Sequence, residues 1–192
     1  MIQRLRVKFI TASMLSLALV LLVILGGVNA MSYQKVVRDA DRILALLSEN
    51  RGVFPQQTPP DDRGGKPGPI PVLGHGISPE TPFESRFFSV LLNEKGQVLQ
   101  SDTGQIAAVD DQSAGEMAQA VWSSGSASGF QGDYRYIRAA EAEGTRFIFV
   151  DCGRSLSNFR TTLIASVLVA LAGLLAVFLL LLILSKRIVR PV

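Results

Sequence analysis

Two long stretches without a charged residue, one near each end of the chain, most constrain what this sequence can form. The first runs from Phe9 to Val28 and the second from Leu163 to Leu184. Each has about 20 residues, enough for a helix to cross a hydrocarbon core of about 30 Å. The sequence between them, from Met31 to Thr162, is polar and rich in turn-forming residues. We therefore expect two transmembrane helices, at 9–30 and 159–184, that flank one domain outside the membrane.

The positions of Lys and Arg predict the orientation of these helices. Three basic residues (Arg4, Arg6, Lys8) precede the first stretch, three (Lys186, Arg187, Arg190) follow the second, and neither tail has an acidic residue. By the positive-inside rule, we expect both termini in the cytosol and residues 31–162 outside the cell membrane. The middle segment has thirteen basic and sixteen acidic residues, so the net charge of +3 comes from the tails. This distribution indicates membrane topology and gives no sign of a nucleic-acid-binding surface.

A cleaved signal peptide is the alternative interpretation of the first stretch, because Val28-Asn29-Ala30 resembles a cleavage site after a basic start. Two features favour a retained helix: the stretch is long for a signal peptide, and an amphipathic pattern continues past Ala30. Its apolar members share one side of a helix: Val36, Val37, Ala40, Ile43, Leu44 and Leu47. Gly52 and Pro55 would end this stalk helix, which we expect within 31–54.

Residues 55–82 contain eight of the nine prolines, a composition typical of a loop or a flexible arm. The only histidine, His75, lies there between two glycines, so we expect a loop residue and no metal ligand. The only cysteine, Cys152, lies in an apolar stretch typical of a strand, so we expect a buried structural thiol. We expect no metal site and no cofactor in this chain.

The segment 83–158 predicts a small α+β core. RFFSVLL (86–92), the turn NEKG (93–96) and QVLQS (97–101) indicate a hairpin. A second hairpin is indicated by 132–140, a turn at 141–144, and 145–152. Between them, Ser113 and Glu116 fit a capping box, followed by an apolar stripe of Ala114, Met117, Ala118, Val121 and Trp122. The order β-β-α-β-β predicts an antiparallel sheet with one short helix on a face, and from Ser155 we expect a helix that continues into the second span.

The last residues, LSKRIVRPV, resemble the opening of a HAMP domain, the parallel helical linker between a second span and a cytosolic signalling module. The matching residues are Ser185, Ile188 and Pro191. Proline is tolerated in the first turn of a helix and disfavoured in its interior, so Pro191 predicts the start of a new helix. We therefore expect residues 185–192 to begin a linker and the chain to be the front of a longer protein.

The chain as a whole resembles the sensor end of bacterial two-component membrane histidine kinases. The stretches that carry this resemblance are TPFESRFFSVLL, DTGQIAAV, the YRY of GDYRYIR, IFVDCGRSL and LSKRIVRPV. The resemblance implies a PAS-like or single-Cache-like extracytoplasmic sensor, a homodimer, membrane lipid as surroundings and a small extracellular ligand. It also implies a response regulator as partner of a kinase module that uses ATP and Mg and lies outside this chain.

No catalytic residues are expected in the chain itself. Its one His and one Cys are far apart in sequence, so they indicate no nucleophile–base pair, and there is no GxGxxG or P-loop pattern. Two alternatives to a kinase input stay open. The chain could be a stand-alone two-span membrane protein that binds a partner, or the sensor end of a chemoreceptor or a cyclase.

A ligand pocket would be expected between the sheet and the helix of Trp122, or under the proline-rich arm. The candidate ligand-binding residues are Arg86, Tyr134, Arg135, Tyr136 and Asp151. Strand alternation places Tyr134 and Tyr136 on one face and Arg135 on the other. An arginine beside aromatic rings can hold a carboxylate by two hydrogen bonds. The alternative interpretation is a half-buried strand with packed tyrosines and solvated arginines.

Overall fold

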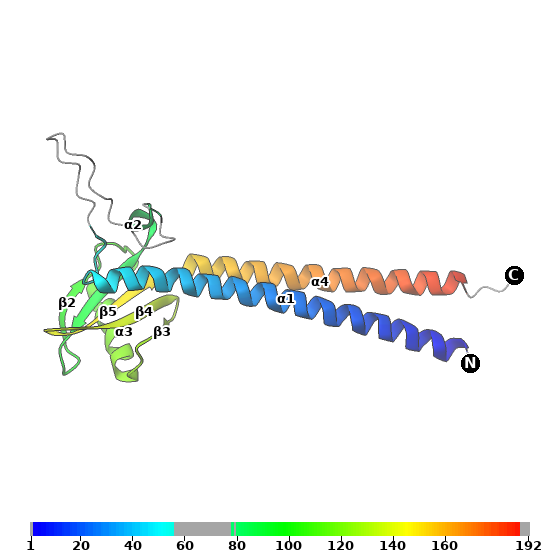
Figure 1. The fold of residues 1–192 in the computed structure, drawn as a ribbon, viewed down its shortest axis with the longest axis horizontal. Helices are drawn as coiled ribbons and strands as arrows, with labels where there is room; N and C mark the ends of the chain where they lie inside the picture. Colours follow the sequence, from blue (N-terminus) through cyan, green and yellow to red (C-terminus); the bar gives the residue numbers. More distant parts are fainter. Residues whose placement is uncertain (1, 56–77, 79, 189–192) are drawn as a thin grey trace, which may run out of the picture. The chain divides into compact units, whose positions relative to one another are not determined.

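The computed structural model describes residues 2–55, 78 and 80–188 (Figure 1). Its helices are α1 (Ile2–Glu49), α2 (Thr81–Glu84), α3 (Asp111–Ser124) and α4 (Gly153–Ile188). Its strands are β1 (Phe87–Leu92), β2 (Val98–Asp102), β3 (Ser128–Gln131), β4 (Tyr134–Glu141) and β5 (Gly144–Asp151). They form two compact units: a helical unit, residues 1–35 and 155–192, and a sheet unit, residues 36–154. Most of the proline-rich segment 55–82, with His75, lies outside the described residues.

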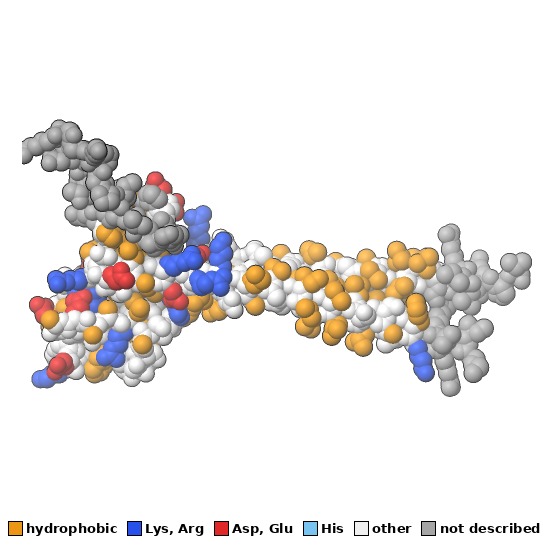
Figure 2. Space-filling model, in the orientation of Figure 1, with side chains coloured by type: hydrophobic (Ala, Val, Ile, Leu, Met, Phe, Trp, Pro, Cys, Tyr) orange, Lys and Arg blue, Asp and Glu red, His pale blue; other side chains and the backbone are white. Residues whose placement is uncertain are grey.

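The helical unit consists of the first part of α1 and nearly all of α4. Both helices are long and apolar enough to cross a membrane, and their most apolar parts are not buried inside the protein. Figure 2 shows hydrophobic side chains along the surface of these helices, and Leu22 and Leu171 are examples that are more than half exposed. α1 continues through Ala30 without a break, as the amphipathic pattern beyond that residue predicts.

An aromatic pair joins the two helices of the helical unit. The rings of Tyr33 in α1 and Phe159 in α4 lie 5.7 Å apart between centroids and are tilted by 53°. Tyr33 follows the apolar stretch of α1, whereas Phe159 precedes that of α4. Because the chain direction of the two stretches is opposite, this pair places one end of each apolar stretch at the same level.

The sheet unit is built on a five-stranded antiparallel sheet with the order β2-β1-β5-β4-β3. Both predicted hairpins are confirmed: β1 pairs with β2, and β4 pairs with β5 through a two-residue turn at Ala142 and Glu143. The long-range pairing of β1 with β5, from Phe87↔Val150 to Leu92↔Thr145, joins the two hairpins into one sheet. β3 was not predicted, because SSGSASG (123–129) has the small and turn-forming residues typical of a helix end.

The two faces of the sheet bury different clusters. Phe88, Phe147 and Phe149 face α3 and form the larger cluster with Ala114, Ala118 and Val121 of that helix. Phe87, Ile148 and Val150 point to the other face and pack against Leu44 and Leu47 of α1. This alternation along β5 leaves it covered on both faces, as its almost continuous burial confirms. The sheet thus lies between α3 and the last turns of α1.

The start of α3 corrects the predicted capping box. The N-cap is Asp110, in extended conformation, and its carboxylate accepts a hydrogen bond of 2.9 Å from the backbone N–H of Ser113. Ser113 is therefore the third helical residue and not the cap. The helix begins earlier because an aspartate is also a good acceptor for an open N–H at a helix start. The predicted apolar stripe is confirmed: Ala114, Ala118 and Val121 are buried, and Met117 and Trp122 pack against the same cluster.

The end of α1 also differs in detail from the prediction. The helix ends at Glu49, and Arg51 has a positive φ of 55°, an unusual conformation for a residue with a side chain. The N–H of Gly52 then donates to the carbonyl of Leu47 at 2.8 Å, the bond that closes a Schellman-type helix end. α4 begins at Gly153, two residues before the expected start at Ser155.

Candidate functional site

The five predicted ligand residues do not surround one cavity in the sheet unit. Tyr134 and Tyr136 lie on the face of the sheet that packs against α3, and Arg135 lies on the face that packs against α1. Asp151 is opposite Tyr134 at the end of β5, and Arg86 is an exposed residue just before β1. A direct role of these residues in ligand binding stays a prediction.

Aromatic rings fill the α3 face near the two tyrosines. Phe88 and Phe149 stack with centroids 4.6 Å apart, and Tyr134 meets Phe88 edge-on at 5.6 Å. Tyr136 is buried and tilted against Phe149 at 5.7 Å. Burial, with the charges of Asp151 and Asp133 as smaller contributions, raises the pKa of Tyr134 above its usual value. These contacts make the tyrosines part of the packed core.

Arg135 holds a carboxylate, as its place beside aromatic residues suggested, but the carboxylate belongs to the chain itself. Its Nε donates to Oδ1 of Asp41 at 2.8 Å, and its Nη2 donates to Oδ2 at 3.3 Å. The guanidinium also lies over the ring of Phe130 in β3, 5.0 Å from the centroid. The arginine side chain is 16% exposed and that of Asp41 is 46% exposed. The site is therefore a cation held between an aromatic ring and an acid that water can reach.

This ion pair links α1 to the outer strands of the sheet. Asp41 is in α1, next to the buried Ala40, whereas Arg135 and Phe130 belong to β4 and β3. Leu44 and Leu47 add apolar contacts one and two turns further along the same helix. The docking of α1 thus depends on one charged contact and a short apolar stripe.

A second arginine on the same face, Arg146, was not among the predicted site residues. Arg146 in β5 is only 7% exposed; its Nε and Nη2 donate to the carboxylate of Glu141 at 2.6 and 3.2 Å. Its Nη1 donates to the hydroxyl of Ser89 in β1 at 3.3 Å. Gly52 packs directly on this group, since a Cβ there would lie 2.8 Å from Oγ of Ser89. The sequence does contain a signal for this site. Arg146 is the one charge within the apolar stretch TRFIFV, and a charge that is buried in a strand needs a partner.

The start of α4 is tied to the sheet by three hydrogen bonds. Asp151 N–H donates to the carbonyl of Arg86 at 2.9 Å, and Cys152 N–H donates to that of Asp133 at 3.0 Å. The side chain of Asp151 accepts from Gly153 N–H at 2.8 Å. Cys152, the only residue between β5 and α4, is buried as predicted, and this burial raises the pKa of its thiol. A single hydrogen-bonded residue, Cys152, therefore separates β5 from the start of α4.

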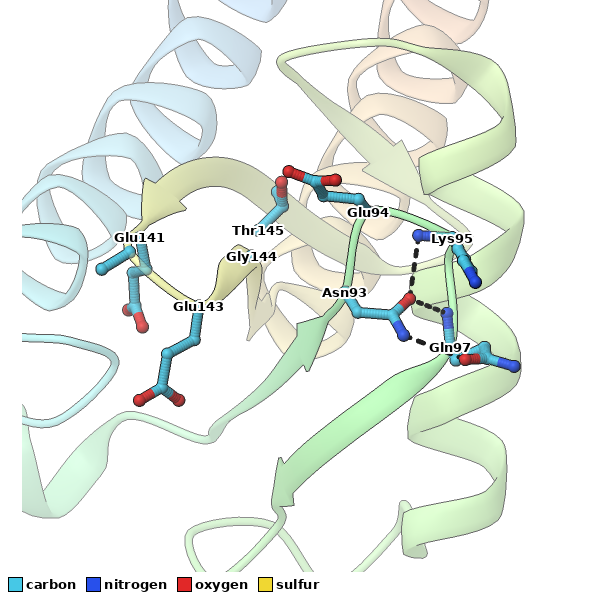
Figure 3. A pocket seen from close by; sticks show the side chains of 9 residues that line it. Asn93, Glu94, Lys95, Gln97, Glu141, Glu143, Gly144 and Thr145 are labelled. Carbon is cyan, nitrogen blue, oxygen red and sulfur yellow. Dashed lines mark hydrogen bonds between the residues drawn. The ribbon is translucent and has the colours of Figure 1, made fainter.

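A depression of about 480 Å³ lies between the β1–β2 and β4–β5 turns (Figure 3). Asn93 organises its rim, since its side-chain oxygen accepts from the N–H groups of Lys95 and Gln97, each at 2.9 Å. Glu94, Glu141 and Glu143 make its lining acidic, but Glu141 already binds Arg146. None of the predicted site residues lines it. The depression is open to solvent and lined mostly by polar residues, so it is poorly suited to bind an apolar ligand.

The remaining predicted positions are outside the sheet unit. Ser185 and Ile188 belong to the last turns of α4, and Pro191 lies outside the described residues. Within the described part of the chain, no group of three or more His, Cys, Asp or Glu side chains is arranged to hold a metal ion.

Comparisons with protein-family models, with curated proteins and with solved structures found no match for this chain. Function must therefore be argued from the arrangement of the residues. The chain has two membrane-length helices, α1 and α4; the last turns of α1 pack on the sheet, and α4 begins one residue after β5.

Proposed function

We propose that this chain is the extracytoplasmic sensing and transmembrane signalling input of a two-component sensor histidine kinase. The observation that carries the proposal is the way the sheet is connected. α1 docks on it through Asp41 and Leu44, and β5 enters α4 after Cys152 alone. The proposed signal starts in the sheet and is passed to both membrane-length helices.

The sheet topology supports a PAS-like or single-Cache-like sensor. The resemblance implies such a domain, and an antiparallel sheet of order β2-β1-β5-β4-β3 with a long N-terminal helix packed on one face is compatible with it. Its two edge strands, β2 and β3, are short. This arrangement supports the class of domain, whereas the stimulus must be found by experiment.

Membrane placement is supported by the exposed apolar surface of the helical unit. Side chains such as Leu15, Leu22 and Val169 are about 70% exposed, which in water would cost about 25 cal/mol for each Å² of apolar surface. We propose a two-pass protein of a bacterial cell membrane, with both termini in the cytosol. The connecting segment is longer than about 60 residues, so its own charges have little weight in setting this orientation.

The proposed mechanism is a shift between two positions of α1 on the sheet. An external anion that binds Arg135 would replace the carboxylate of Asp41, which accepts hydrogen bonds from both Nε and Nη2 of the arginine. Ligand binding and docking of α1 would then compete, and the ligand would favour the undocked state. In a homodimer this shift would move α4 and, through residues 185–192, a HAMP linker and a kinase module. ATP, Mg and the response regulator belong to that module.

A chimera tests the signalling function. The full chain is joined after Val192 to the HAMP and kinase modules of a well-characterised sensor, and autophosphorylation is measured in membranes. Insertion of one alanine between Leu184 and Ser185 should change activity, because it rotates everything downstream by about 100°. The same insertion in the β1–β2 turn, between Glu94 and Lys95, serves as the control. Equal activity of both insertion variants and the parent would contradict the proposed helical path.

Labelling in intact cells tests the orientation. In a Cys152→Ser background, Glu94→Cys should react with a membrane-impermeant maleimide because Glu94 is exposed in a turn of the sheet unit. Lys8→Cys should react only after the membrane is opened. The reverse pattern would show that the domain is cytosolic and would exclude an extracytoplasmic sensor.

A further inference from the structure

The part of α1 that packs on the sheet is held there by contacts of two kinds. Near its start, the carboxylate of Asp41 accepts two hydrogen bonds from Arg135, and the Asp41 side chain is 46% exposed. Water screens an ion pair at this level of exposure, so the contact is weak, and the buried Ala40 beside it adds only a methyl group. Further along the helix, Leu44 and Leu47 are 1% and 0% exposed and pack against apolar side chains of the sheet. The helix is therefore held less firmly at Asp41 than at Leu47.

The chain just after α1 is also held firmly. A Cβ on Gly52 would lie 2.8 Å from Oγ of Ser89, so the backbone there is in direct contact with the sheet. Ser89 is 2% exposed and accepts a hydrogen bond of 3.3 Å from the buried Arg146. Two residues after Gly52, the ring of Phe54 meets that of Phe87 edge-on, with centroids 5.2 Å apart. These contacts fix the end of α1 on the sheet.

The only cysteine of the chain lies close to the weaker contact. Cys152 follows Val150 by two residues, and Val150 is the residue of β5 that pairs with Arg135. Its Sγ lies 3.7 Å from the carbonyl oxygen of Val150, and the residue is 4% exposed. Burial raises the pKa of the thiol, with smaller effects from the backbone of Arg135 and from the charges of Asp151, Arg135 and Asp41. The thiol is therefore buried within reach of the Asp41–Arg135 ion pair.

We propose that α1 pivots on the sheet about its end at Leu47 and Gly52, and that the Asp41–Arg135 ion pair is the latch that holds the earlier residues down. This inference rests on the proposed function, because it specifies how α1 shifts. When the latch opens, residues 36–43 move away from the sheet while Leu47 and Gly52 stay in place. Asp41 lies about 9 Å along the helix from Leu47, so a rotation of about 20° moves it by about 3 Å. That movement is enough to break both hydrogen bonds to Arg135.

The reaction of Cys152 with a maleimide tests the latch. The full chain is purified in detergent micelles, and the labelling rate reports how often the buried thiol becomes exposed. Asp41→Ala should raise this rate about two- to fivefold, the factor that corresponds to loss of a partly exposed ion pair. The matched control, Asp39→Ala, removes an acid whose ion pair with Arg42 lies within α1, and it should leave the rate unchanged. Equal rates in the Asp41→Ala and Asp39→Ala variants would overturn the latch.

A thiol at the other end of the docked helix tests the pivot. In the Cys152→Ser/Ser89→Cys chain, the thiol lies under Gly52 at a position that is 2% exposed, and the exchange changes the size of each side chain little. Asp41→Ala should leave the labelling rate of this chain unchanged. Phe54→Ala, which removes the ring contact with Phe87, should raise it about fivefold or more. No rise with Phe54→Ala would show that this end is held elsewhere and would overturn the pivot.

The two thiol positions also separate this inference from the proposed function, because labelling needs no kinase module. If Asp41→Ala raises the rates at both positions equally, α1 leaves the sheet as a whole; the pivot is then rejected, but the signalling input is not. If the labelling agrees with the pivot while the alanine insertion after Leu184 leaves kinase activity in the chimera unchanged, the pivot is supported and the signalling path is rejected.

Discussion

Arg135 in β4 donates two hydrogen bonds to the carboxylate of Asp41 in α1, a residue 94 positions earlier in the chain. The pair joins the helix that leaves the apolar stretch to the outer part of the sheet. Because Arg135 also lies over the ring of Phe130, the arginine keeps one contact when the acid is removed. The acid is therefore the partner that can be exchanged.

Removal of this pair should weaken the docking of α1 modestly. A double-mutant cycle with Asp41→Ala and Arg135→Ala should give a coupling energy of about 0.5–1 kcal/mol, because half-exposure of Asp41 lets water screen the charge. Arg135→Ala alone should cost more than Asp41→Ala, because it also removes the contact with Phe130. Urea unfolding of the full chain in detergent micelles measures each value.

The neighbouring ion pair provides the control for that cycle. Arg42 and Asp39 lie 3.6 Å apart within α1, and both side chains are about half exposed. A cycle on these residues should give only about 0.3 kcal/mol. A coupling energy for Asp41 and Arg135 no larger than this would contradict a specific docking contact.

The buried arginine of β5 predicts a larger effect. Glu141→Ala should cost about 2–3 kcal/mol, since it leaves the guanidinium of Arg146 buried without its acid. Replacement of both residues by methionine should recover most of this loss, because the need to solvate a charge disappears. Glu143→Ala, two residues away and exposed, should change stability by less than about 0.5 kcal/mol. If the double methionine variant is no more stable than Glu141→Ala, Arg146 has another essential role.

Local sequence patterns predicted most of the sheet unit, and strand β3 is the main exception. The strands around Phe88 and Phe149 alternate or are continuously apolar, and turn residues separate them, so both hairpins could be predicted. Strand β3 has only one large apolar residue, Phe130, and includes Gly129. It forms because its backbone pairs with β4, and because the ring of Tyr136 lies directly against Gly129. Such a cause is not visible in the four residues themselves.

The candidate site was harder to predict than the fold because its contacts are long-range. Strand alternation placed Arg135 correctly on the face opposite Tyr134 and Tyr136, but it could not reveal which element covers that face. Asp41 lies outside the apolar stripe of its helix, where a solvated side chain is expected, yet its carboxylate meets Arg135. Pairing across more than 90 residues depends on how β1 joins β5, which no short pattern specifies.

Gly52 should resist substitution for two separable reasons. Its φ of 82° disfavours any side chain, and a Cβ would lie 2.8 Å from Oγ of Ser89 and 3.3 Å from Cδ of Arg146. Gly52→Ala should therefore cost about 2 kcal/mol or more. Gly125 has a similar φ of 69° with no atom near the added Cβ, so Gly125→Ala should cost only about 1 kcal/mol. If Gly52→Ala and Gly125→Ala lose the same stability in urea unfolding, the side chains of Ser89 and Arg146 can move away from the added Cβ with no measurable loss of stability.

Asp110 should make the stability of α3 depend on pH. Hydrogen bonds from the side chain and the backbone N–H of Ser113 lower the pKa of Asp110 below its ordinary value of 3.8. The folded chain therefore binds a proton at Asp110 less readily than the unfolded chain does. The charged cap stabilises the fold at pH values above 3.8, and this contribution is lost as the pH falls through the lower pKa of the folded state. Asp110→Asn keeps an acceptor oxygen but cannot titrate, so it should remove the pH dependence that the cap contributes. Asp110→Ala removes the acceptor and should therefore also lower stability at pH 7. Helix content and unfolding midpoints at pH 7 and pH 3 measure both; a wild-type and Asn variant with identical pH profiles would contradict a charged cap.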